Sequence, residues 1–156
     1  MKVAWFSHWR LFCLIALLAL AMSLLVRASI TQAAEGTQSD LTDIHSGQKL
    51  GRVIIASNGG GHGDFRAEVT VNLHRVAPNT TFHVTRAIDL TPDGVLSNPP
   101  DLPWIEVGTI TTSAGGAGET HFVRTGTPAP RFDVMLKVLG DDGTELDSSV
   151  MTITVK

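Results

Sequence analysis

Residues 65–75 read FRAEVTVNLHR, a run in which apolar and polar side chains alternate without interruption up to Leu73. A period of two is the repeat of a β-strand that has one face buried and the other in contact with water. Residues 80–90 continue this alternation, and one of their faces carries Phe82, Val84, Ile88 and Leu90. The two runs therefore predict two half-buried strands.

Five further short runs rich in β-branched and apolar residues flank these two, and clusters of Gly, Pro, Asn and Asp separate them: 50–57, 104–112, 119–125, 131–139 and 150–156. No window shows the apolar stripe of a helix, and the Asp142-Gly143 pair is typical of a tight hairpin turn. Short strands at this spacing are the signature of an antiparallel sandwich or barrel. We predict an all-β fold, a seven-stranded antiparallel β-sandwich of immunoglobulin-like character, over residues 50–156.

One segment resembles a known family. Residues 76–84 read VAPNTTFHV and are similar to the Leu-x-Pro-x-Thr-x-Tyr-x-Val segment of fibronectin type III domains, with Phe82 in place of the family's Tyr. The resemblance covers nine residues, only two predicted strands precede it, and Arg86 replaces an apolar residue of the pattern. It implies an immunoglobulin-like sandwich and no catalytic residues.

The N-terminus has the order of a secretory signal peptide. Basic residues precede an apolar run at 11–26, and a short segment rich in small residues follows it. Thr31 and Ala33 suit the small positions before a cleavage site, so we predict a signal peptide over 1–33, cleaved after Ala33. The alternative is an uncleaved anchor, since a run of sixteen residues, apolar apart from Ser23, is long for a signal core. A membrane span usually needs about 20, which favours cleavage.

The expected location follows from this leader. We predict a secreted or extracytoplasmic protein, in the periplasm or at the cell surface of a bacterium, in contact with a membrane only if cleavage fails. Residues 34–49 are mostly polar and are expected to form a flexible spacer. The chain has one cysteine, Cys13, so neither a disulfide within the chain nor a CxxC metal site can form.

The charge balance excludes one class of partner. The whole chain of 156 residues has a net charge of −3. Without the three basic residues of the leader, 9 basic residues remain against 15 acidic ones, a net charge of −6. An acidic domain has no electrostatic attraction to nucleic acid or to anionic membranes. No nucleic-acid partner is expected.

Histidines offer a metal hypothesis. If residues 76 and 81 closed a hairpin turn, His74 and His83 would lie directly opposite each other on the outer face, at about 4.5–5.5 Å between Cβ atoms. His121 would be the obvious third ligand for copper or zinc, and His62 a fourth. The competing interpretation, favoured because no HxH or HExxH spacing is present, is an exposed histidine pair without a ligand.

Other candidate chemistry is weaker. Four acidic residues within 141–147 could attract calcium, although their spacing is not that of an EF-hand loop. Ser57 lies in no GxSxG elbow, and no pair of carboxylates can be nominated for hydrolysis. We predict that the protein is not an enzyme and that it carries no cofactor, with copper or zinc as the alternative.

Two residues are possible ligand contacts. Arg86 falls on the same predicted face as Phe82 and Val84, where an unpaired charge is costly. We expect it at the end of a sheet, with its guanidinium reaching solvent or an acid, and a ligand-anchoring role at a sheet edge is the alternative. Trp104, the only tryptophan after the leader, is expected in the core or at a sheet end rather than as a binding platform.

The expected function is that of an exported, non-enzymatic β-sandwich module that binds a protein, a glycan or an envelope component. Its loops or a sheet face would make the contact, because rigid sandwiches place recognition there. The alternative is an extracytoplasmic copper- or zinc-binding protein that uses the surface histidines.

Overall fold

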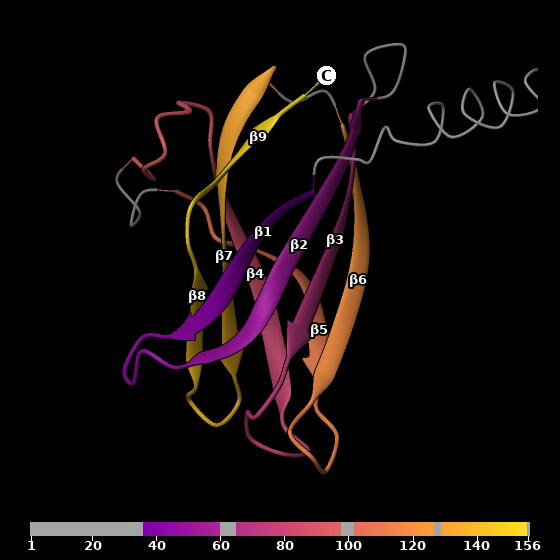
Figure 1. Cartoon of the computed structure of the whole chain (residues 1–156), viewed down its shortest axis with the longest axis vertical. Coiled ribbons are helices and arrows are strands. Elements are labelled where there is room, and N and C mark those ends of the chain that lie inside the picture. Colours follow the sequence, from indigo (N-terminus) through magenta and orange to yellow (C-terminus); the bar gives the residue numbers. More distant parts are fainter. Residues whose placement is uncertain (1–35, 60–64, 98–101, 127–128, 156) are drawn as a thin grey trace, which may run out of the picture. The chain divides into compact units, whose positions relative to one another are not determined.

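The computed structural model describes residues 36–59, 65–97, 102–126 and 129–155. In this part of the chain all regular structure is β, and all seven predicted strands are confirmed together with two more (Figure 1). No helix within these residues has the length and hydrophobicity to cross a bilayer. The predicted signal peptide, 1–33, lies outside the described residues. The strands are β1 (Gly36–Asp43), β2 (Lys49–Gly59), β3 (Phe65–Leu73), β4 (Thr81–Asp89), β5 (Ile105–Thr111), β6 (Gly118–Gly126), β7 (Arg131–Gly140), β8 (Glu145–Ser148) and β9 (Met151–Thr154).

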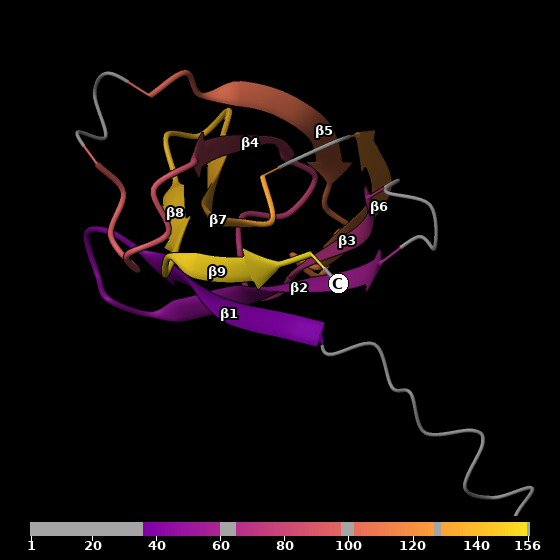
Figure 2. The ribbon, with the colours of Figure 1, turned by 90° about the horizontal axis from the view of Figure 1, so that it is seen from above.

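The strands form one antiparallel sheet that curls into a nearly closed barrel. Its order is β5-β4-β7-β8-β1-β2-β3-β6, and β9 also pairs with β7. Viewed along the strands, they surround a central core, and β5 lies near β6 (Figure 2). The prediction of a seven-stranded sandwich is therefore corrected. The reason is β8, which pairs with β7 on one side and β1 on the other and so joins what would otherwise be two sheets.

Strand β1 corrects a second expectation, the flexible spacer at 34–49. It pairs with β2 over seven residues and with β8 over three. Because only Ser39 and Leu41 of this strand are buried, the strand needs few apolar residues. Its sequence therefore resembles that of a polar linker. Its stability comes from hydrogen bonds to both neighbours, and the folded domain already includes Gly36.

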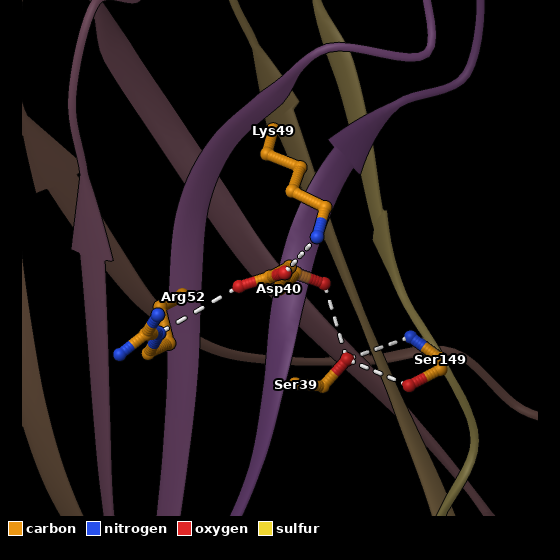
Figure 3. Close-up of polar contacts among 5 residues, drawn as sticks. All are labelled: Ser39, Asp40, Lys49, Arg52 and Ser149. Atoms are coloured by element: carbon orange, nitrogen blue, oxygen red, sulfur yellow. Dashed lines mark hydrogen bonds and ion pairs between the residues drawn. The ribbon is translucent and has the colours of Figure 1, made fainter.

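Polar side chains fasten β1 to its surroundings (Figure 3). The Ser39 hydroxyl accepts a hydrogen bond from the Ser149 N–H at 2.9 Å and shares another with the Ser149 hydroxyl at 2.8 Å. Asp40 on the opposite face forms an ion pair with Lys49 at 2.6 Å and lies 3.6 Å from Nε of Arg52. These contacts connect β1 to β2 and to the short segment between β8 and β9.

The predicted Asp-Gly hairpin is confirmed between β7 and β8. Gly143 has a φ of 86°, a conformation that suits a residue without Cβ. Its N–H donates to the Gly140 carbonyl at 2.9 Å, while the Gly140 N–H donates to the Thr144 carbonyl at 2.8 Å. The turn thus sets the register that places β8 between β7 and β1.

Many of the fully buried side chains lie toward the end of the barrel that holds this hairpin. Fully buried side chains meet there from several strands: Leu41, Val71, Phe82, Val84, Ile110, Val138 and Leu146. The inward residues of the predicted alternation in β3 and β7 are buried as expected. Toward the other end, inward residues surround a cavity instead.

A loop covers the outer face of β4 and β7. Asp89 and Asp133 are register partners on that face, and both are buried. Asp89 accepts hydrogen bonds from the N–H groups of Thr91 and Ser97, at 2.8 and 2.7 Å. Asp133 accepts one from the Gly94 N–H at 2.6 Å. The two carboxylates thus hold residues 91–97 against the sheet.

Candidate functional site: an interior cavity with two arginines

A cavity of about 320 Å³ lies at the end of the barrel where β4 ends and β7 begins, and it is partly open to solvent. Its walls come from β2, β3, β4, β6, β7 and β9. Most of the lining is apolar: Ile55, Phe65, Ala67, Val69, Ile88, Leu90, Phe122, Phe132, Val134, Leu136 and Ile153. The rings of Phe65 and Phe132 meet edge to face at 5.7 Å. Two arginines, Arg86 and Arg124, complete the lining together with Thr125 and Gly126.

Strand register explains why both arginines belong to the cavity. Residues directly opposite each other in an antiparallel pair share one face of the sheet. Arg86 on β4 is paired with Leu136 of β7, which is buried. Arg124 on β6 is paired with Ala67 of β3, which is also buried. Both guanidinium-bearing side chains therefore start from the interior face, on two strands that are far apart in the sheet order.

Arg86 is a charged residue in the middle of an otherwise apolar face. Its Nε is buried and has no hydrogen-bond partner among the described residues. Burial, and after it the charge of nearby Arg124, lowers the pKa of Arg86. Within the described part of the chain, no carboxylate oxygen comes within 4.0 Å of a nitrogen of either arginine. The described residues thus give the site positive charge and no counter-ion.

Arg124 spans the seam between the two end strands of the sheet. Its Nη2 donates a hydrogen bond to the Val107 carbonyl of β5 at 3.1 Å. Its guanidinium carbon lies 5.1 Å from the centroid of the Phe122 ring, a cation–π distance. Arg124 is an exposed residue that also lines the cavity, so it lies at the boundary between the cavity and solvent.

The structure differs from the expectation for Arg86. It was predicted at a sheet end, with solvent or an acid as partner, or at a sheet edge beside a ligand. It is paired on both sides, with Leu136 and with Ile105, and no acid reaches it among the described residues. Alternation identified its face correctly, but its position in the sheet depends on β5, which covers the edge of β4.

Trp104 does not line the cavity. It precedes β5 and is partly exposed, and Nζ of Lys137 lies 5.3 Å from the centroid of its ring. This contact is on the outer face, because Lys137 is paired with Thr85 and Asp147 there. Trp104 is therefore a partly covered outer-face residue.

The three histidines are not gathered at one place. β3 pairs with β2 and β6, and β4 pairs with β5 and β7, so the hairpin assumed to place His74 opposite His83 is not formed. His121 lies on the outer face of β6, opposite Thr70. Among the residues that the structure describes, no group of three or more His, Cys, Asp or Glu could hold a metal. Copper or zinc binding stays a prediction.

His83 instead lies between two acids. Its Nδ1 is 3.3 Å from Glu106 and its Nε2 is 3.3 Å from Asp141. The two ring nitrogens point to opposite sides, so these carboxylates could not join His83 around one ion. The acidic residues at 141–147 also have separate partners. Asp142 accepts hydrogen bonds from Thr144, and Glu145 forms an ion pair with Lys137.

Sequence reasoning missed the cavity and Arg124. The signal for Arg124 was present, because it follows Phe122 by two residues and so belongs to the same inward face. The cavity itself had no such signal, since it is formed by side chains from six strands.

Comparisons with protein-family models and with curated proteins find no match for this chain.

Proposed function

We propose that this protein is an exported, non-enzymatic binding module that holds a small, largely apolar molecule in the cavity of its barrel. The observation that carries the proposal is the cavity itself. Small-molecule sites are typically concave pockets with a mainly apolar lining and a few polar groups, and this pocket has that composition. An apolar cavity of ~150 Å³ already accepts a benzene-sized molecule, and this one measures about 320 Å³, within the range of ligand pockets.

The lining supports binding rather than catalysis. Among the described residues, the polar side chains around the cavity are Arg86, Arg124 and Thr125, and none is a His, Ser, Cys, Asp or Glu. General acid–base and nucleophilic catalysis need such groups within hydrogen-bond reach of the substrate. The earlier hypothesis placed recognition on loops or a sheet face. The proposal keeps a binding module and moves its site to the interior.

A neutral fluorescent probe, N-phenyl-1-naphthylamine, tests the proposal. Its emission rises when it leaves water, so titration of the protein should give a saturable increase. Val69→Phe should reduce probe affinity by about tenfold or more, because the larger side chain occupies the cavity. The matched control is Thr70→Phe on the next residue, which faces outward and should bind as the wild type does.

Thermal melts of both variants establish that they fold. If the wild type binds no probe, or if Val69→Phe binds it as tightly as the wild type does, the cavity is not a binding site.

A further inference from the structure

We infer that the cavity selects a monocarboxylate with an apolar body, such as a medium-chain fatty acid, whose head group docks between Arg86 and Arg124. This inference rests on the proposed function and specifies the ligand class of the same site. It is argued from charge, from hydrogen bonding and from the shape of the lining.

Charge is the first argument. Two guanidinium groups line one cavity, and the described residues supply neither of them with a carboxylate. Like charges at one partly buried site repel each other, and burial adds a desolvation cost. A bound anion would relieve both effects. A neutral ligand would relieve neither, and a cationic one would increase the repulsion.

Hydrogen bonding is the second argument. The buried Nε–H of Arg86 has no acceptor among the described residues, and a buried donor without an acceptor is costly. The guanidinium is a planar fork that fits a carboxylate through two parallel hydrogen bonds. A carboxylate oxygen at Arg86 would satisfy Nε. Arg124 can turn toward the same head group if its hydrogen bond to the Val107 carbonyl is broken.

The lining provides the third argument. Apart from the arginines, Thr125 and Gly126, the wall is aliphatic and aromatic, including Phe65, Phe132 and Ile153. Such a wall stabilises CH₂ groups by about 0.8 kcal/mol each when they leave water. Apart from the arginines, Thr125 is the one lining side chain among the described residues that could hydrogen-bond the hydroxyl groups of a sugar. The combination of an anionic site and an apolar chamber therefore fits an amphiphile and not a glycan.

The experiment measures displacement of N-phenyl-1-naphthylamine by decanoate, decanol and acetate at pH 8. Decanoate should bind to the wild type at least about tenfold more tightly than decanol, which corresponds to one charge-assisted hydrogen bond or more. Acetate, which has the head group alone, should displace no probe at the same concentrations.

Two variants locate the anchor. Arg86→Met keeps an unbranched apolar stem and removes the guanidinium, so the preference for decanoate over decanol should fall to about twofold or less while decanol binding persists. Arg124→Met should reduce the same preference, and it carries the test if Arg86→Met does not fold. Arg66→Met is the matched control, because Arg66 is an exposed residue of β3 paired with Glu68. It should keep the wild-type preference.

The outcomes separate the two claims. Equal binding of decanoate and decanol by the wild type overturns the anion-selective site and leaves the cavity as a binding site. A preference that survives in both arginine variants also overturns it. If neither the probe nor either ten-carbon ligand binds, the proposed function itself fails.

Discussion

Arg86 places a charge on a face of β4 where the neighbouring inward residues, Val84 and Ile88, are apolar. In a domain without a ligand this arrangement destabilises the fold, because burial disfavours the charged form and Nε lacks a hydrogen bond. Residues that reduce stability in this way are frequent where a protein binds something. Arg86 is therefore the residue at which stability and the proposed function oppose each other.

We expect ligand-free Arg86→Met to be more stable than the ligand-free wild type. Replacing a partly buried charge, whose Nε has no acceptor among the described residues, by an unbranched apolar side chain should raise the free energy of unfolding by about 1 kcal/mol. Urea denaturation monitored by circular dichroism measures this. Arg66→Met should change it by no more than about 0.5 kcal/mol, as expected for a surface residue. A loss of stability in Arg86→Met would show that its guanidinium is well satisfied.

At the scale of the element, β1 and the β8–β9 segment decide how the sheet closes. β8 and β9 have four residues each, and they pair with different parts of β7: β8 with residues 137–139 and β9 with residues 131–134. Ser149 lies in the interruption between them, where its N–H has no strand partner and donates to the Ser39 hydroxyl instead. One serine of β1 thus satisfies the backbone at the point where this edge of the sheet changes direction.

Ser39→Ala should reduce the free energy of unfolding by about 1–2 kcal/mol, because it leaves the part-buried Ser149 N–H without an acceptor. Chemical denaturation is the measurement, and Gln38→Ala, on the exposed face of the same strand, is the control with an expected change below about 0.5 kcal/mol. If the two variants lose stability equally, the Ser39–Ser149 contact does not hold β1 in place.

At the scale of the whole molecule, several carboxylates link stability to pH in the same direction. Backbone N–H groups of Thr91 and Ser97 hold the pKa of Asp89 below its usual value of 3.8. The hydrogen bond from Lys49 lowers the pKa of Asp40, and the backbone N–H of Ser46 lowers that of Asp43. Among the described residues, Asp147 opposes them, since burial raises its pKa. The domain as a whole should therefore lose stability in acid.

The sign follows from linkage. A carboxylate with a lowered pKa in the folded state stabilises the fold fully above its unfolded pKa, and this stabilisation is lost as pH falls through the folded value. We expect the free energy of unfolding to decrease below about pH 4. Asp89→Asn should flatten this decrease, as measured by urea denaturation at pH 6 and pH 3. Asp93→Asn controls for the loss of one charge from the same loop. A slope in Asp89→Asn identical to that of the wild type contradicts the assignment.

Local alternation was sufficient for most of the fold. The all-β class, the seven strands and the Asp142-Gly143 turn follow from a period of two and from turn chemistry, both of which act between residues a few positions apart. Strand β1 was not predicted, because a strand that is hydrogen-bonded to neighbours on both sides needs few apolar residues. Alternation predicted that Arg86 faces inward, and the same rule could have predicted the inward direction of Arg124.

Only the tertiary structure determines which strands pair with each other. Alternation assigns a side chain to a face, but the same pattern results whether β3 pairs with β4 or with β6, since every antiparallel pairing preserves it. The energetic difference between such arrangements comes from packing among residues distant in the chain. Long-range packing thus separated His74 from His83, joined β7 to β1 through β8, and brought Arg86 and Arg124 to the lining of one cavity.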